Sequence, residues 1–412
     1  MTKNLPLTFI FITVVIDAMG IGLILPVMPD LIREVNGGDL GQAALWGGIL
    51  TTVYAVMQFG FGPLVGNLSD RFGRRPVLLT SLVVMAIDYV VMALAGAIWL
   101  LFIGRIVGGV TAATQSTAMA YVADISKPEE KAANFGLIGA AFGVGFVFGP
   151  LIGGLLASYG TRAPFYAAAV LAGANFLFGY FVLPETVTDR IRRPFSLARA
   201  NPFGAFKHIG ALPGLRPMLV LMFFYGVAFF VYPAVWAYYG QIRFGWGPGM
   251  VGVSLAVYGI SIAVVQGVLI RPILARIGDR KAVILGLIVE VAAFVFLGFV
   301  QAGWMALAFT VVAAFGAIAG PALQGIMSRT AQDNQQGELQ GILTSINAIA
   351  VIIAPLIMTQ TFFFFTRENA PIYSPGAPFL LSAVLTVVCI GLFLMARPTA
   401  TQGVATQPPP AA

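Results

Sequence analysis

The sequence predicts an all-α integral membrane protein whose twelve transmembrane helices form two similar six-helix halves. Two observations lead to this fold class. Of the 412 residues, 59% are hydrophobic and only 9% are charged, whereas a soluble chain of this length needs far more charge to cover its surface. The apolar stretches also run on for about 20 residues, the length of a membrane-spanning helix, and lack the alternation of an outer-membrane barrel.

The expected spans follow one another closely. The first half holds spans at about 7–29, 44–66, 76–95, 98–122, 134–157 and 163–183, and the second at about 215–239, 248–270, 281–300, 303–327, 339–364 and 377–397. We expect the first span to be a retained helix and not a cleaved signal peptide, because Asp17 lies in its middle and only Lys3 precedes it. An even number of spans places both termini on one side of the membrane.

Basic residues are divided unequally between the two sets of loops. Of the 23 lysines and arginines, 18 fall on the side of the termini, and four (Arg33, Arg162, Arg243 and Arg367) fall on the opposite side. Positive charge is enriched in the cytoplasmic loops of membrane proteins. We therefore expect a multi-pass protein with both termini in the cytoplasm, and the net charge of +7 needs no nucleic-acid partner to explain it.

A basic segment with several prolines divides the chain. We expect residues 1–183 to form the N-terminal bundle, 184–213 a cytoplasmic linker, 214–397 the C-terminal bundle and 398–412 a disordered cytoplasmic tail. The halves share a degenerate repeat, in which Gly73 after the second span aligns with Gly278, 205 residues later. Similar halves are typical of transporters that bind substrate between their repeats.

Four ionisable side chains fall well inside the expected spans: Asp17, Asp88, Arg105 and Glu290. Each costs about 2.5–3.5 kcal/mol at the bilayer centre, so such residues face water or one another. An acid–arginine pair that only holds helices together is one interpretation. Acids in both halves favour a central proton-coupling site, because a buried acid can be protonated or ionised and a proton and a cationic drug then compete for it.

These acids have separate expected roles. Asp17 and Asp88 are the candidates for the proton and substrate acids, and Glu290 for the cation-facing acid of the second half. Arg105 is expected to pair with Asp17. Further substrate-binding candidates are the polar residues Gln58, Gln115, Asn175 and Gln324, for which interhelical hydrogen bonds are the alternative. The seventh span carries the aromatic residues Phe224, Tyr225, Tyr232 and Trp236. They either face lipid or the core, or they stack on a planar drug.

Two further clusters concern conformational change. Gly145, Gly149 and Gly153 share one face of the fifth span beside Pro150, and we expect a hinge there and a sliding contact between the halves. The loop after the second span carries Asp70, Arg71, Arg74 and Arg75. We expect a cytoplasmic gate that closes in the outward-facing state, with topology-setting charge as the alternative.

Several motifs resemble those of the major facilitator superfamily. Gly66-x-Leu-Ser-Asp-Arg-x-Gly-Arg-Arg-Pro resembles its signature loop, Leu101-x-x-x-Arg105-x-x-x-Gly109 the fourth-helix motif of its proton-coupled members, and Gly145-x-x-x-Gly149-Pro150-x-x-Gly153 the fifth-helix motif of its drug/proton antiporters. Within the superfamily, the chain is most similar to the tetracycline efflux antiporters of Gram-negative bacteria. That similarity lies in Asp17-Ala-Met-Gly, Tyr54-Ala-Val-Met-Gln58, Ile87-Asp88-Tyr89, Pro321-Ala-Leu-Gln324 and Gln336-Gly-Glu-Leu-Gln340.

The resemblance implies export of tetracycline, as a divalent-metal chelate, in exchange for protons across the bacterial inner membrane. It implies a monomer with no cofactor and no permanently bound metal, in which Mg²⁺ enters only with the drug. The sequence departs from the family at Glu290, where an Asp is typical, and near Ile262, where a His is frequent. A broader-range multidrug or metabolite/proton antiporter is the alternative, and a facilitative uptake carrier is a third.

An enzyme is not expected. The sequence contains neither an H-E-x-x-H motif nor a phosphate-binding G-x-x-x-x-G-K-[ST] loop. Its one cysteine, Cys389, and one histidine, His208, exclude a disulfide framework and a His/Cys metal cluster.

Overall fold

A computed structural model describes residues 5–396 except 113, 128, 189–191, 193, 197–200, 205–212 and 333–334. The side chains of residues 114, 115, 132 and 213 also lie outside this description. The described residues form helices, turns and irregular segments, and no strand occurs among them. The predicted tail 398–412 and most of the predicted linker fall outside them.

Twelve helical segments of the described chain are long and apolar enough to cross a membrane, so the predicted all-α membrane fold is confirmed. In the first half these are α1 (Leu5–Ile24), α3 (Leu40–Phe72), α4 (Arg74–Leu94), α5 with α6 (Ile98–Thr111 and Thr114–Ile125), α7 (Lys131–Leu156) and α8 (Ala163–Val182). In the second half they are α9 with α10 (Arg216–Phe229 and Val231–Phe244), α11 with η5 and α12 (Pro248–Val264, Val265–Leu269 and Ile270–Ile277), α13 (Asp279–Phe299), α14 with η6 and α15 (Gly303–Ala313, Ala314–Ile318 and Ala319–Thr330), α16 (Gln336–Thr366) and α17 (Ala377–Met395).

The first span ends earlier than predicted. After α1 the chain turns through residues 25–27, and a separate helix α2 (Met28–Asn36) follows. Pro26 lacks the backbone N–H that would continue α1, and Pro29 lies in the first turn of α2, where a proline is tolerated. Helix α2 carries Asp30, Arg33 and Glu34 and lies outside the spans.

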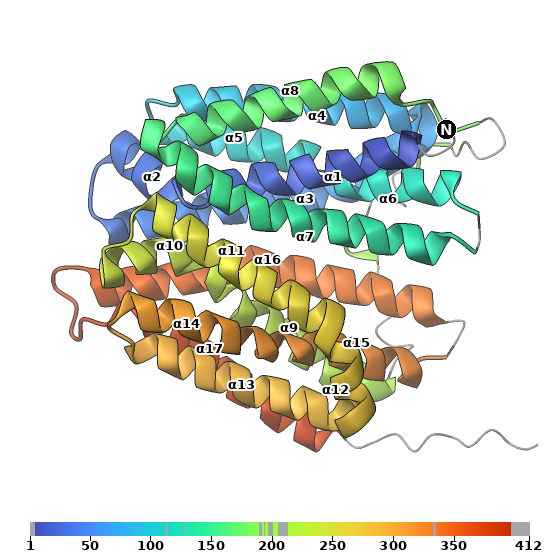
Figure 1. The fold of residues 1–412 in the computed structure, drawn as a ribbon. Helices are drawn as coiled ribbons and strands as arrows, with labels where there is room; N and C mark the ends of the chain where they lie inside the picture. Colours follow the sequence, from blue (N-terminus) through green and yellow to red (C-terminus); the bar gives the residue numbers. More distant parts are fainter. Residues whose placement is uncertain are drawn as a thin grey trace, which may run out of the picture.

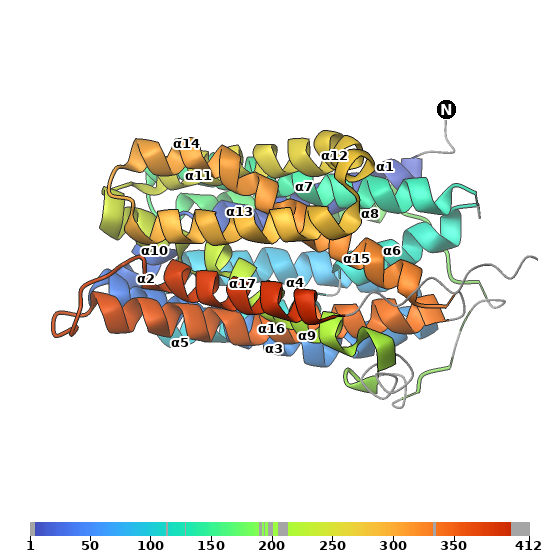
Figure 2. The same cartoon turned by 90° about the horizontal axis from the view of Figure 1, so that it is seen from below.

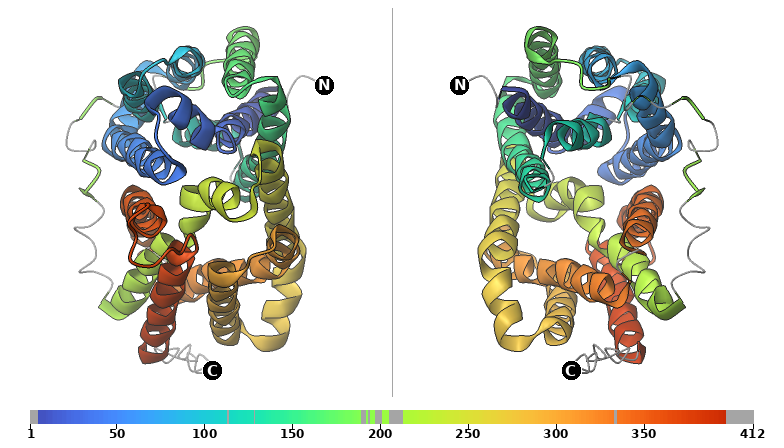
Figure 3. Two further views of the ribbon diagram at one scale, coloured as in Figure 1. Left: turned by 90° about the vertical axis from the view of Figure 1, so that its left-hand side faces the viewer. Right: turned by 90° about the vertical axis from the view of Figure 1, so that its right-hand side faces the viewer.

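The helices are arranged as two bundles. Figure 1 shows α1–α8 on one side of the molecule and α9–α17 on the other, and the end-on views of Figure 3 show the bundles next to each other. Helix α3 packs against α16 and helix α7 against α11, and these two pairs join the bundles. We call the end at which α1 begins the termini side, and the end at which α2 lies the far side; Figure 2 shows both ends from below.

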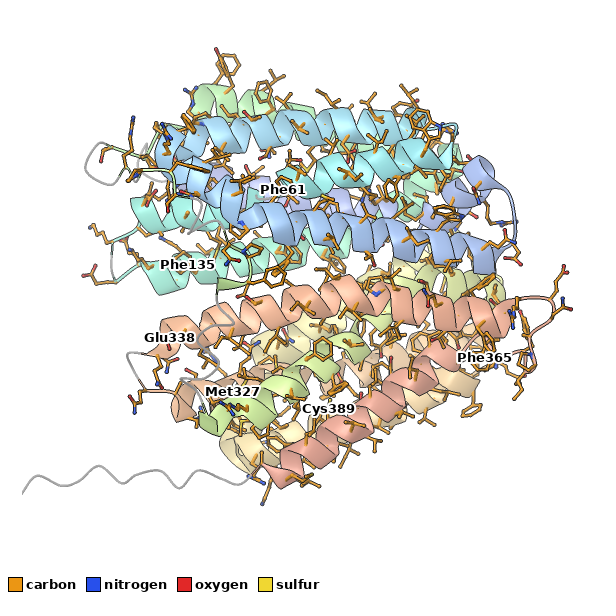
Figure 4. The ribbon with its side chains drawn as sticks, turned by 180° about the vertical axis from the view of Figure 1, so that it is seen from behind. Phe61, Phe135, Met327, Glu338, Phe365 and Cys389 are labelled. Atoms are coloured by element: carbon orange, nitrogen blue, oxygen red, sulfur yellow. The ribbon has the colours of Figure 1, made fainter. Side chains whose placement is uncertain are left out.

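The bundles touch toward the far side and part toward the termini side. One cluster of buried side chains contains residues of both bundles, including Leu31, Tyr238 and Phe362. Toward the termini side the buried residues form separate clusters in each bundle. Helices α7 and α12 diverge in this direction in Figure 1, and Figure 4 shows Phe135 and Glu338 at this end on opposite bundles.

The space around the glycines of α3 changes in the same way, from tight packing at the far side to open space toward the termini side. A Cβ on Gly48 would collide with Thr359 of α16, whereas Cβ atoms on Gly60, Gly62 and Gly66, nearer the termini side, would meet open space. The molecule is therefore closed at the far side and parted at the termini side.

Candidate functional site

The buried acid of the first half is held between α4 and α5. Asp88 Oδ2 lies 3.6 Å from the guanidinium of Arg105, and the two side chains are 4% and 13% exposed. Two glycines of α5 make room for the carboxylate, because a Cβ on Gly104 or Gly108 would lie 2.7 or 2.9 Å from its oxygens. Small residues at these positions let the acid insert between the helices.

Arg105 therefore pairs with Asp88, and the prediction that it pairs with Asp17 was wrong. Helix α5 packs against α3 and α4, so the arginine reaches the acid of α4 before that of α1. Its guanidinium also lies over the ring of Tyr54, 5.4 Å from the centroid. Tyr54 interacts electrostatically with Asp17, Asp88 and Arg105, which places the three predicted coupling residues of this half around one tyrosine that the sequence motif contained.

Asp17 itself is only partly buried on α1. Among the described residues it makes no salt bridge.

The buried acid of the second half has a different environment. Glu290 on α13 is 3% exposed, and the hydroxyl of Tyr225 donates to its Oε1 at 3.2 Å. Its Oε2 has no hydrogen-bond partner, and no described cation lies within salt-bridge distance. Gly316 of η6 packs against its Cγ and leaves no room for a side chain there.

Aromatic residues surround this acid on the side of α10 and α11. The rings of Tyr232 and Tyr258 lie 4.9 Å apart, and both tyrosines interact electrostatically with Glu290. Together with Trp236 and Phe309 they line a small pocket. Trp236 is buried and donates to Ser254 Oγ at 2.8 Å, so this residue belongs to the core, and Tyr225 is the aromatic residue of the seventh span that contacts the acid.

Gln58 supports a break in the fourth span. Helix α5 ends at Thr111 and α6 begins at Thr114, and Gln58 Nε2 donates to the carbonyl of Ala112 at 3.3 Å. The tenth span is interrupted by η6, where Gln266 Nε2 donates to the carbonyl of Ala317 at 3.2 Å. Ala317 follows Ala112 by the same 205 residues that separate the repeated glycines. We call Gln58 and Gln266 the glutamine braces.

The structure describes the side chains of two of the three remaining polar candidates. Asn175 is 2% exposed and accepts from Thr13 Oγ1 at 3.3 Å, so it links α8 to α1 inside the first half. Gln324 is exposed on α15, and the side chain of Gln115 lies outside the described residues. Their part in substrate binding stays a prediction.

The glycine face of α7 (Gly145, Gly149 and Gly153) packs against α1 of the same half. A Cβ on any of the three would collide with the α1 backbone. The prediction that these glycines contact the other half was therefore wrong. That contact is made by the adjacent face, on which the carbonyl of Pro150 and the Cα of Gly154 approach Gly252 of α11. The hinge role stays a prediction.

The predicted gate residues form a charged cluster within the first half. Arg74 lies 2.5 Å from Asp70 and 3.2 Å from Asp124. The backbone N–H groups of Arg74 and Arg75 donate to Glu185, which follows α8.

Arg71 makes a different contact from the other predicted gate residues, and the second half has its own ion pair at the termini side. Arg71 is exposed and lies over Phe72. In the second half Arg329 pairs with Asp279, at the positions that align with Asp124 and Arg74 but with the charges exchanged. The sequence analysis missed Asp124 and Glu185, which lie far from the motif along the chain, although the 205-residue repeat points from Arg329 to Asp124.

Several known proteins are similar to this chain in sequence. The profile of the Major Facilitator Superfamily matches residues 10–271 and 218–411. The chain belongs to the major facilitator superfamily. It is 41% identical to the class C tetracycline resistance protein of Escherichia coli, over 95% of this chain and 96% of that protein. It is 38% identical to the class G protein of Vibrio anguillarum, over 94% and 96%. The resemblance to this superfamily and to tetracycline resistance proteins of Gram-negative bacteria is confirmed.

Solved structures share the superfamily's fold. A bacterial homologue of the human lysosomal transporter Spinster, described as inward-facing and unoccupied, matches with a TM-score of 0.76 and 16% identity over 96% of this chain and 97% of that one. The human organic anion transporter MFSD10 (TETRAN) matches with a TM-score of 0.69 and 23% identity over 95% and 100%. At these identities the likeness concerns the fold. No three His, Cys, Asp or Glu side chains of the described chain gather as a metal site.

Proposed function

We propose that this chain is a secondary active transporter that exports tetracycline, as a divalent-metal chelate, in exchange for protons. The observation that carries the proposal is the 41% identity to a tetracycline resistance protein over almost the full length of both chains. Buried acids in both bundles support it, since coupling to protons needs groups that can bind them. The drug crosses the membrane without covalent change, and its Mg²⁺ arrives and leaves with it.

The distribution of basic residues orients the molecule. In the sequence, 18 of the 23 lysines and arginines fall in the loops expected on the side of the termini, so we place this side in the cytoplasm and the far side in the periplasm of the bacterial inner membrane. A molecule closed at the far side and parted at the termini side is then inward-facing. In this state the carrier, acting as a monomer, takes up its drug from the cytoplasm or from the inner leaflet.

The acids divide into two kinds. Asp88 and Arg105 neutralise each other, and this pair needs no further charge. Asp17 and Glu290, one in each bundle, have no described cation as partner. An uncompensated carboxylate in an apolar environment is costly, and a bound proton or a cationic chelate removes that cost. Proton and chelate therefore compete for the same acids, and this competition is the basis of exchange.

Everted membrane vesicles with an acid interior test the proposal. Their interior corresponds to the periplasm, so the native protein is expected to accumulate tetracycline only with both the pH gradient and Mg²⁺. Asp17→Asn and Glu290→Gln are expected to abolish the uptake. Glu368→Gln, in an exposed far-side loop, is the matched control and is expected to leave uptake unchanged.

Two outcomes count against the proposal. Uptake that survives collapse of the pH gradient contradicts proton exchange. Vesicles that contain folded protein but take up no tetracycline contradict the substrate, and a panel of cationic drugs then tests the broader-range alternative, for which Glu290 and the absent His of the eighth span are the motivating departures.

A further inference from the structure

A hydrogen bond between two side chains connects α2 of the first bundle with α10 of the second at the far side. Gln241 Nε2 of α10 donates to Asp30 Oδ2 of α2 at 3.2 Å. The Asp30 side chain is only 28% exposed, because α2 lies against α3 and α10. Asp30 therefore lies at a contact between the bundles, where a far-side opening that separates α2 from α10 would break this bond and expose the carboxyl to water.

The other charged groups around Asp30 are few. On α2 itself, Arg33 lies 3.9 Å from Asp30, and Glu34 accepts from Thr161 and lies 3.9 Å from Arg162. On α10, Tyr238 interacts electrostatically with Asp30, and Arg243 donates to the carbonyls of Phe299 and Val300. On α3, Asp39 accepts from the N–H of Gln42, and on α5 the one charged residue, Arg105, pairs with Asp88.

We propose that Asp30 is an additional proton-binding site of the transporter, located at the far-side gate, and that its protonation favours closure of that gate. The inference rests on the proposed function, since it takes the far side to face the periplasm and the transporter to be driven by protons. A proton that arrives from the periplasm while the gate is open then promotes the return to the inward-facing state.

The direction of the pH effect on gate closure follows from the environments of Asp30 in the closed and open molecules. In the closed molecule, burial is the largest effect and raises the pKa of Asp30 above its ordinary value of 3.8; Glu34 adds to the rise, whereas Arg33 and the hydrogen bond from Gln241 oppose it. In the open molecule, water restores the ordinary value. The closed form therefore binds the proton more tightly. Closure is favoured as the pH falls through the raised pKa, and this gain is lost as the pH rises above it.

Gln241 suits both charge states of Asp30. Its amide donates to the ionised carboxylate, and after a flip its carbonyl accepts from the protonated acid. Protonation thus removes the cost of burying the charge without loss of the hydrogen bond between the bundles.

Distances between the far-side ends of the bundles test the proposal in purified, membrane-reconstituted protein. Spin labels at Asn36→Cys on α2 and Asn369→Cys in the loop after α16, both exposed, are introduced into a Cys389→Ala background and measured by double electron–electron resonance between pH 8 and 5. The ratio of closed to open molecules is expected to rise as the pH falls. Asp30→Asn, a mimic of the protonated acid, is expected to remain mostly closed at pH 8.

The size of the change is also defined. For each unit by which closure raises the pKa of Asp30, protonation of Asp30 can increase the ratio of closed to open molecules up to tenfold. Asp30→Asn is expected to remove this part of the pH-dependent rise. Gln241→Leu is expected to open the gate at every pH. Asp39→Asn is the matched control, because Asp39 caps a helix outside the contact, and it is expected to behave as the native protein. A pH profile of Asp30→Asn identical to the native one overturns the proposal. No drug is present, so a failure of tetracycline transport leaves this result intact.

Discussion

In the first half of the molecule the buried acid of the third span, Asp88, lies 3.6 Å from Arg105. In the second half the buried acid of the corresponding helix, Glu290, accepts a hydrogen bond from Tyr225 and has no described cation within salt-bridge distance. The aligned positions explain the difference. Asp88 aligns with Ala293, one helical turn after Glu290, and Arg105 aligns with Thr310, whose hydroxyl donates to its own helix. One half thus holds a balanced pair and the other an acid whose charge something else must balance.

The scaffold around these acids is repeated more faithfully than the charges. Each half has an interrupted fourth helix, and in each a glutamine brace donates to a backbone carbonyl at the interruption. In each half a glycine of that helix, Gly104 or Gly316, makes room for the acid. The comparison teaches that the two halves share a mechanical frame but differ at the acid beside their fourth helix, which is paired with an arginine in the first half and with no described cation in the second.

The largest expected effect on stability is at the balanced pair. Arg105→Met leaves Asp88 buried without a cation, and breaking such a pair costs about 3–5 kcal/mol. The double variant Asp88→Leu/Arg105→Met is expected to recover most of the loss, because it leaves no uncompensated charge. Thermal unfolding in detergent measures both. If the single variant is as stable as the native protein, Asp88 is not balanced by Arg105.

A smaller difference in stability is expected between the two ion pairs at the termini side. Arg74 is 12% exposed between Asp70 and Asp124, whereas Arg329, the partner of Asp279, is 61% exposed. Arg74→Ala removes charged hydrogen bonds worth about 1.5–3 kcal/mol, and Arg329→Ala removes an exposed pair worth about 0–1 kcal/mol. Chemical unfolding of the two variants side by side measures the difference. Equal losses contradict the interpretation that only the first pair is structural.

The glutamine braces should behave alike. Gln58→Leu and Gln266→Leu each remove the hydrogen bond from the glutamine amide to a backbone carbonyl. Each loss is expected to lower the free energy of unfolding by about 1 kcal/mol. The double variant is expected to lose the sum of the two, since the braces lie in different halves. A thermal shift confined to one of the two variants shows that the repeat of this feature is accidental. Gln58→Glu or Gln266→Glu, which lacks the amide donor, serves as a second check.

The smallest effect on stability is expected at Glu290. Glu290→Gln keeps the shape of the side chain and its acceptor for Tyr225 and has no cation to leave unpaired, so the unfolding free energy is expected to change by less than about 1 kcal/mol. Exchange of drug for protons is nevertheless expected to be lost. A stability loss as large as that of Arg105→Met indicates that Glu290 has a buried partner and that the two halves are alike.

The sequence predicted the parts that depend on local chemistry. Spans of apolar residues, the four charged positions inside them and the signature loop were all readable, because hydropathy and rare polar residues are local signals. The partners of these residues were less accessible. Arg105 was assigned to the wrong acid and the glycine face of α7 to the wrong bundle, because a partner depends on which helices are neighbours and how each is rotated. Helix α2 was missed because the break at Pro26, between α1 and α2, falls inside an apolar stretch.

The measurement that tests the central claim most directly is proton release on drug binding. Purified protein in weak buffer is mixed with Mg²⁺ and tetracycline, and the released protons are followed with a pH indicator, in the native protein and in Glu290→Gln. If chelate and proton compete for the unbalanced acid, the native protein releases protons in proportion to bound drug, and the variant releases measurably fewer. Equal release by the two proteins, with equal drug binding, contradicts the account.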